Sequence, residues 1–205
     1  MTEITSSAPQ SRGPTDHNVR DQILEAAGEH FSRYGYDKTT VSELAKAIGF
    51  SKAYIYKFFD SKQAIGEAIC AKTLSAMVAA VEEAVAGAST PTEKFRRMFK
   101  TLTATGANLF FHDRKLHDIA AHAAGEGWPP ARDYAERIRQ MLMEVVREGR
   151  ATGEFERKTP LDETVHAIYL VVHPYANPLL LQHNLDRIEE ASAQLSNLVL
   201  RSLAP

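Results

Sequence analysis

The sequence has little of several features that mark common classes of protein. A single cysteine, Cys70, among 205 residues excludes an internal disulfide and any metal site built from several cysteine ligands. No run of about 18 apolar residues occurs, so we expect no membrane-spanning segment. P-loop, HExxH and nucleophile-elbow patterns are also missing. The sequence therefore predicts a protein that is not an enzyme and needs no cofactor.

The N-terminal residues lack the apolar stretch of a signal peptide and are rich in serine and proline. We expect residues 1–17 to form a mobile arm and the protein to be cytoplasmic. Arg12 in this arm could reach a DNA minor groove, although a plain unstructured tail is the simpler interpretation.

The overall charge is close to balanced, with 24 Lys and Arg against 26 Asp and Glu. A basic domain is therefore absent, but one segment departs from the average. Residues 38–62 contain five lysines but only two acidic residues, Glu43 and Asp60. Because counterion release depends on the charges that touch phosphate, this local excess matters more than the total. The lysines are Lys38, Lys46, Lys52, Lys57 and Lys62.

A short amphipathic helix with clear ends lies within this basic segment. Thr40 and Glu43 have the spacing of a capping box, in which each side chain accepts from the other residue's backbone N–H. Gly49 follows the helix where a left-handed residue is needed, and Ser51 is placed to cap a second helix. The apolar stripe of the first helix consists of Val41, Leu44, Ala45 and Ile48.

The second helix has two different faces. Ile55, Phe58 and Phe59 share one face, and we expect all three to pack inward. Tyr54 and Tyr56 accompany lysines on the other half, where phenol and ammonium groups suit a phosphate-lined groove. Core packing is the alternative for both tyrosines, since aromatic side chains are commonly buried. Two short helices joined at a glycine are typical of a helix-turn-helix whose second helix enters the DNA major groove.

The segment from Arg20 to Ala68, about a quarter of the chain, resembles the tetracycline-repressor family of bacterial regulators. The resemblance implies that Thr40, Tyr56 and Lys62 contact phosphates. It also implies that the groove-facing positions are Ser51, Lys52, Ala53, Tyr54 and Lys57. Tyr54 replaces a smaller residue of the family, so it could contact a thymine methyl, a phosphate or nothing. The matching residues are Phe31-Ser32-Arg33-Tyr34-Gly35-Tyr36, Thr39-Thr40-Val41, Leu44-Ala45, Gly49-Phe50-Ser51-Lys52, Ile55-Tyr56-Lys57-Phe58-Phe59 and Ser61-Lys62.

The remaining sequence predicts further helices and no strands, giving an all-α fold of about nine helices. We expect a DNA-binding domain over 18–66 and a helical ligand-binding and dimerisation body over 67–205. A long helix over about 61–86 is expected to connect them, and a shorter one to cover about 116–124. We predict a loop over 125–130 and a kink or break over 173–178, where prolines occur.

The resemblance further implies a homodimer, formed through the last two helices, and a small-molecule effector bound in the body. The predicted function is a ligand-responsive regulator, with repression the favoured effect. It would bind a palindromic operator in double-stranded DNA and leave it when a small hydrophobic or aromatic molecule binds. Ordinary core packing is the alternative for the apolar residues concerned. The candidate ligand-binding residues are Phe95, Met98, Phe99, Leu102, Phe110, Phe111, Trp128, Met141, Tyr169 and His173.

Three histidines motivate a different function. His112, His117 and His122 are spaced by five, which places neighbours about 140° apart on a helix and prevents a shared face. We therefore expect surface or capping roles and no metal site. The alternatives are a small-molecule-binding or metal-dependent protein that uses this segment, or a regulator whose body binds a protein instead of a metabolite.

Overall fold

The computed structural model describes residues 16–205, and every regular element in this range is a helix. The all-α prediction is confirmed, with ten α-helices and one short 3₁₀ helix in the described range. Arg12 and most of the expected arm lie outside the described residues, and α1 begins at Asp16.

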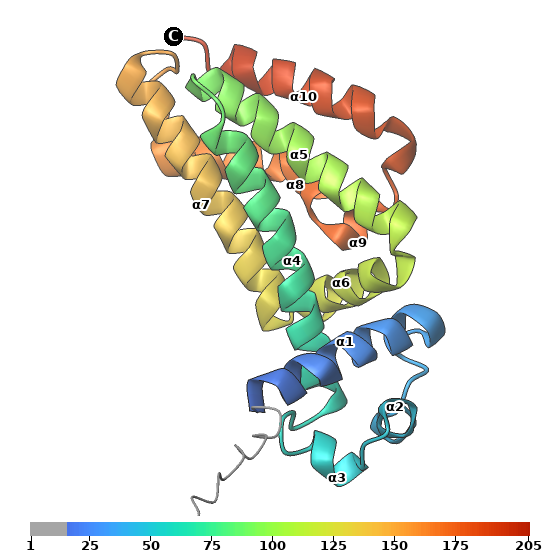
Figure 1. The fold of residues 1–205 in the computed structure, drawn as a ribbon. Helices are drawn as coiled ribbons and strands as arrows, with labels where there is room; N and C mark the ends of the chain where they lie inside the picture. Colours follow the sequence, from blue (N-terminus) through green and yellow to red (C-terminus); the bar gives the residue numbers. More distant parts are fainter. Residues whose placement is uncertain (1–15) are drawn as a thin grey trace, which may run out of the picture.

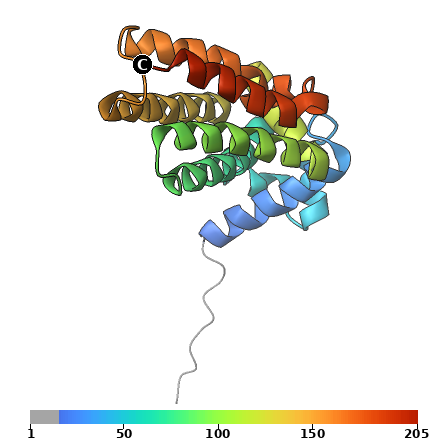
Figure 2. The same cartoon turned by 90° about the horizontal axis from the view of Figure 1, so that it is seen from above.

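The helices form a small head and a larger body, with α4 leading from one into the other (Figure 1). The head consists of α1 to α3, and α8 and α10 run along an outer side of the body (Figure 2). The elements are α1 Asp16–Tyr34, α2 Val41–Ile48, α3 Lys52–Ile55, α4 Lys62–Ala86, α5 Pro91–His112, α6 Arg114–Glu126, α7 Pro129–Thr152, α8 Leu161–Ala176, α9 Pro178–Leu181, the 3₁₀ helix η1 Leu185–Arg187 and α10 Ile188–Ser202.

The ends of α2 follow the pattern read from the sequence. The Thr40 hydroxyl accepts from the Glu43 N–H at 3.2 Å, and Glu43 Oε2 accepts from the Thr40 N–H at 2.8 Å. Gly49 ends the helix in the left-handed conformation, with φ of 74°, which a side chain would disfavour. The capping box and the glycine turn are therefore both confirmed, and they fix where α3 can start.

The start of α4 is held by a serine cap without a capping box. Ser61 caps this helix by accepting from the Ala64 N–H at 3.0 Å. Gln63 consequently stands one position too early to complete a capping box, and it donates to Glu67 at 2.9 Å instead.

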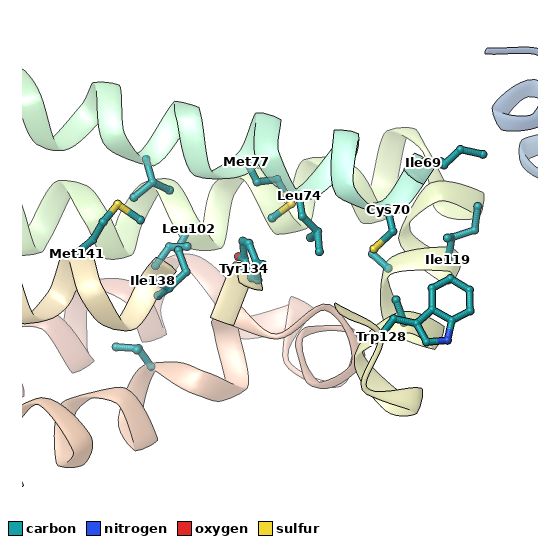
Figure 3. Packing of buried hydrophobic residues seen from close by; sticks show 14 of the residues in the cluster. Ile69, Cys70, Leu74, Met77, Leu102, Ile119, Trp128, Tyr134, Ile138 and Met141 are labelled. Atoms are coloured by element: carbon teal, nitrogen blue, oxygen red, sulfur yellow. The ribbon is translucent and has the colours of Figure 1, made fainter. Parts of the chain in front are cut away.

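The core of the body is built around α4. Figure 3 shows Cys70, Leu74 and Met77 on α4 and Tyr134, Ile138 and Met141 on α7 within one packed cluster of buried side chains. By length and composition α4 is also apolar enough to cross a membrane, a test that the core helix of a soluble protein passes as well. The expectation of no membrane-spanning segment therefore stays a prediction, and within the body α4 packs against α5, α6 and α7.

The predicted loop over 125–130 is wrong in its extent. Helix α6 continues to Glu126, Gly127 ends it with φ of 65°, and α7 already begins at Pro129. Proline is well tolerated in the first turn of a helix because the N–H it lacks would have no partner there. The proline pair therefore starts a helix, and only Gly127 and Trp128 connect α6 to α7.

The predicted kink or break over 173–178 is confirmed, and the structure places it near the end of that range. Helix α8 includes Pro174 and ends at Ala176. The break falls at Asn177, whose ψ of 120° is extended and whose side chain accepts from the Leu179 N–H at 2.9 Å. Because Pro178 disfavours a helical conformation in the residue before it, the second proline explains the break.

Candidate nucleic-acid interface

The short helix α3 is held by one cap and two buried side chains. The Ser51 hydroxyl accepts from the Tyr54 N–H at 3.1 Å. Ile55 and Phe59 are buried and fix the helix to the rest of the head. The opposite face is open to solvent, and its exposed residues are Ser51, Lys52, Ala53, Tyr56 and Lys57.

The two tyrosines near α3 have different surroundings. Tyr56 is exposed, and the Lys52 ammonium lies 5.7 Å from its ring centroid. Tyr54 is half-buried, with its ring centroid 5.1 Å from that of Phe50 and 5.4 Å from that of Phe58. Phe58 is also half-buried and packs against the core, as expected for the inward face. Tyr54 packs against the core as well, so part of its ring takes the packing role that was the alternative for this residue.

Thr40 is exposed beside this surface, and its hydroxyl serves the helix cap. Besides accepting from the Glu43 N–H, it donates to the Glu43 carboxylate at 2.9 Å. Hydrogen bonds from the Thr40 backbone N–H and then its hydroxyl lower the pKa of Glu43, with a smaller contribution from His30. The carboxylate therefore stays ionised at neutral pH and keeps the Thr40 side chain in a single orientation.

Lys62, the first residue of α4, is half-buried and already has partners in the protein. Its ammonium donates to the Tyr36 carbonyl at 3.2 Å and lies 4.3 Å from the centroid of the Tyr36 ring. The sequence offered no indication of this contact, because 26 residues separate the pair.

The ten candidate ligand-binding residues fall into three environments. Phe110 is half-buried, and Phe111 is 65% exposed. Tyr169 and His173 line a small cavity of about 20 Å³, room for roughly one water molecule. Tyr134 borders the same cavity and donates its hydroxyl to the Ala176 carbonyl at 3.1 Å. The other six are buried in the hydrophobic core, namely Phe95, Met98, Phe99, Leu102, Trp128 and Met141.

A much larger cleft lies between the head and the body, and the sequence did not indicate it. It has a volume of about 1650 Å³ and is open to solvent. Its walls come from α1, α2, α4, α5 and α6, and none of the ten candidates lines it. Ser32 on one wall donates to Asp113 on the other at 3.2 Å. Because the lining is contributed by five separate elements, no local sequence pattern marks it.

The three histidines lie on two helices and have unlike environments. His112 is exposed at the end of α5, and His122 on α6 is half-buried beside Tyr36 and Trp128. His117 is fully buried, so the expected surface or capping role is wrong for this residue. The single-helix spacing applies to His117 and His122 on α6 but not to His112, because α5 ends at His112 and α6 starts at Arg114. Within residues 16–205, no group of three or more His, Cys, Asp and Glu side chains is placed to hold a metal.

Two buried groups stay uncharged at neutral pH. Nε2 of His117 donates to the Pro178 carbonyl at 3.0 Å, while Nδ1 has no hydrogen-bond partner. Burial is the main cause that lowers the pKa of His117. Burial, with a smaller effect of Glu67, raises the pKa of the Cys70 thiol to about 12. Cys70 is thus a small core residue and a poor nucleophile.

Comparison with known proteins gives matches to both parts of the chain. The model for bacterial regulatory proteins of the tetR family matches residues 23–69. The model for the tetracyclin repressor-like C-terminal domain matches residues 91–198, more than half of the chain.

The curated relatives match over a limited part of the chain. The IcaR negative transcriptional regulator of the biofilm operon icaADBC, from Staphylococcus aureus (strain Newman), is 43% identical over 49 residues, or 24% of this chain and 26% of the relative. The transcriptional repressor Rv1474c of Mycobacterium tuberculosis is 42% identical over 60 residues, or 29% and 32% of the two chains. The matches thus span about a quarter to a third of these relatives.

Solved structures match over nearly the whole chain. The TetR family regulator PfmR from Thermus thermophilus is 27% identical with a TM-score of 0.61, and covers 89% of this chain and 99% of its own. The FadR regulator of Bacillus subtilis, solved in complex with stearoyl-CoA, is 19% identical with a TM-score of 0.66, and covers 89% and 98%. At that identity the FadR match concerns the fold alone.

Proposed function

We propose that this chain, which belongs to the tetR family of bacterial regulatory proteins, is a DNA-binding transcriptional repressor that works as a homodimer and is released by a small molecule. The observation that carries the DNA-binding part is the exposed face of α3. Its lysine, serine and tyrosine side chains point outward, while Ile55 and Phe59 anchor it from below. Repression is supported by the two curated relatives, one described as a negative regulator and the other as a repressor.

In this proposal α3 lies in the major groove and its neighbours contact the backbone. Lys57 and Lys52 are exposed on or directly after a helix whose side chains reach base edges in other helix-turn-helix proteins. Tyr56 and Lys62 supply a hydroxyl and an ammonium group to phosphates, which fix position but carry no sequence information. Thr40 joins them when its hydroxyl proton turns from the Glu43 carboxylate to a phosphate. Tyr54 is half-buried, so its part is to support the surface, with its hydroxyl available to a phosphate.

The dimer in this proposal forms through α8 and α10. Leu170 on α8 and Leu198 on α10 are among the exposed large apolar side chains of the described residues, at 58% and 53% exposure. A pairing of these helices around a two-fold axis would cover them and give each dimer two heads. Two heads can read a palindromic operator when their recognition helices stand about 34–36 Å apart, one turn of DNA.

The effector in this proposal enters the body at the cavity beside Tyr169 and His173. The cavity is small and mostly apolar, with alanines around its wall, so an occupant would have to push α7 and α8 apart. Because α4 packs against α7, such a displacement would reach the heads and alter their spacing. A ligand acts in this way only if it binds the displaced state more tightly than the DNA-binding state.

Selection of bound sequences from a random DNA pool tests the first part of the proposal. We expect the full chain to enrich a two-fold symmetric sequence, and the bound species to contain two protomers. Lys62→Ala should weaken binding to all sequences about equally and reduce the salt slope by about one for each bound head. A chain that enriches no sequence and ignores DNA at every salt concentration would rule the function out.

The separation of the two heads tests the release mechanism. Spin labels on exposed head positions, compared with and without an inducing molecule, should report a changed distance. If the molecule releases DNA while the distance stays fixed, release works in another way. Sedimentation at micromolar concentration that shows only a 22.7 kDa species would exclude the dimer.

A further inference from the structure

Tyr36, in the head, contacts Lys62, the lysine that binds a DNA phosphate in the proposed function. Tyr36 follows α1, and two of its groups contact Lys62: the carbonyl accepts from the ammonium at 3.2 Å, and the ring lies 4.3 Å from it. A lysine side chain has many rotamers, and holding it in one of them removes an entropic cost of binding. The ammonium has three donors, so the contact with one carbonyl leaves two for a phosphate.

The ring of Tyr36 is held by the body as well as by the head. Its centroid lies 5.3 Å from that of Phe31 on α1, 5.4 Å from that of His122 on α6 and 5.5 Å from that of Trp128. His122 and Trp128 contact each other at 5.2 Å. One aromatic cluster, formed by Tyr36, His122 and Trp128, thus connects the body to the residue that holds Lys62.

Helix α4 leaves no spare room beside this cluster. A Cβ atom added at Gly66 would lie 2.8 Å from Tyr36 Cε2 and 3.0 Å from Trp128 Cζ3. Such distances are shorter than van der Waals contact, so the two rings meet the helix backbone directly. Because Tyr36 and Trp128 both pack against the backbone at Gly66 and against each other, we expect a movement of Trp128 to shift Tyr36.

We propose that Tyr36 is a positioning residue for the phosphate contact of Lys62, and that the body sets the place of Tyr36 through His122 and Trp128. This inference rests on the proposed function, since only there is Lys62 assigned to a phosphate. The body then controls one DNA contact directly, in addition to the spacing of the heads. Burial raises the pKa of the Tyr36 phenol to about 12, so the ring stays neutral at physiological pH.

The salt dependence of DNA binding distinguishes positioning from a general loss of structure. Lys62→Ala sets the reference, a salt slope lower by about one per head. Tyr36→Leu removes the ring, and we expect it to lower the slope by a similar amount. The double variant should then lose no more than either single variant, because both remove the same contact. Tyr36→Phe keeps the ring and the carbonyl and should bind like the unchanged protein.

Other outcomes would overturn the role of Tyr36. If Tyr36→Leu weakens binding with the slope unchanged, and adds to Lys62→Ala, Tyr36 is only a structural residue. If Tyr36→Leu strengthens binding and steepens the slope, Tyr36 withholds Lys62 from DNA.

A pair of histidine variants tests the contribution of the body. His122→Ala changes a residue that lies in the body and contacts Tyr36, and we expect a slope between those of the unchanged protein and Lys62→Ala. His112→Ala serves as the matched control, because this exposed ring is absent from the cluster. If His122→Ala and His112→Ala gave equal salt slopes, the body would have no part in placing Tyr36.

A measurement without DNA separates this inference from the proposed function. Lysines carrying ¹³C-methyl groups report nearby rings by NMR, and the Lys62 signal is identified by its loss in Lys62→Arg. We expect this signal to be shifted upfield by the Tyr36 ring, to stay shifted in Tyr36→Phe and to return to the ordinary position in Tyr36→Leu. DNA binding without the shift would overturn the positioning role alone, whereas the shift without any DNA binding would overturn the proposed function and the role with it.

Discussion

The head and the body are stabilised by different interactions. In the head, α2 has eight residues and α3 has four, lengths at which an isolated helix does not form in water. Their shape depends on the Thr40 and Ser51 caps and on buried side chains that belong to the same hydrophobic cluster as those of the body. In the body, α4, α5 and α7 have 22 to 25 residues each and share a continuous core. The DNA-facing surface is therefore sensitive to single hydrogen bonds, and the body to lost volume.

The largest expected effect tests the volume side of this comparison. Phe99 on α5 is 1% exposed and contacts Tyr175, so Phe99→Ala should lower the free energy of unfolding by about 3–5 kcal/mol. Phe111→Ala is the matched control on the same helix, because this side chain is 65% exposed and should change the value by less than about 0.5 kcal/mol. Urea unfolding measures both. Equal losses would mean that Phe111 is covered in solution.

A second prediction concerns the exposed face of α3. If Lys57 reads a base, Lys57→Ala should cost about 1–3 kcal/mol of discrimination between specific and random DNA, with the stability of the fold unchanged. Competition binding with the two DNAs measures this difference. Lys100→Ala on α5 removes the same charge from an exposed site in the body and should preserve the discrimination. An equal loss on both DNAs would make Lys57 a phosphate contact.

The third prediction addresses the hydrogen bonds of the head. Thr40→Ala removes the acceptor for the Glu43 N–H and should lower the free energy of unfolding by about 0.5–2 kcal/mol. Thr40→Ser keeps the hydroxyl and should recover most of the loss. Hydrogen exchange would show whether α2 opens before the body does. If Thr40→Ala left the stability unchanged, the caps would not be what maintains the head.

The same contrast explains how far the sequence could predict the structure. Caps and glycine turns involve residues three or four apart, so the box of Thr40 and Glu43 and the turn at Gly49 could be recognised without coordinates. The body depends on contacts between distant residues, such as His117 with the Pro178 carbonyl, 61 positions away. The burial of His117, the cleft beside α1 and the Tyr36 contact with Lys62 were therefore not predictable from local patterns. The roles given to the DNA-facing and ligand-binding residues stay predictions.

The smallest expected effect comes from a buried group of the body. Burial lowers the pKa of His117 below its usual value of about 6.5, although the Pro178 carbonyl and Asp118 oppose this effect. Below pH 6.5 the unfolded chain therefore binds a proton that the folded protein refuses, so stability falls as the pH drops toward the folded-state pKa. The slope from one group cannot exceed about 1.4 kcal/mol per pH unit.

His117→Gln should flatten the loss of stability between about pH 6.5 and 5, since the amide does not titrate there. The matched control is His112→Gln, which alters an exposed histidine on α5. Its stability should depend on pH in the same way as that of the unchanged protein. Unfolding curves at several pH values, with Asp118 and Arg114 unchanged beside the ring, measure the difference between the two variants. Identical profiles would mean that His117 gains a partner for Nδ1 when it is protonated. Asp118 is placed to be that partner, because its Oδ1 lies 3.7 Å from Nδ1 and a small rotation would bring the two together.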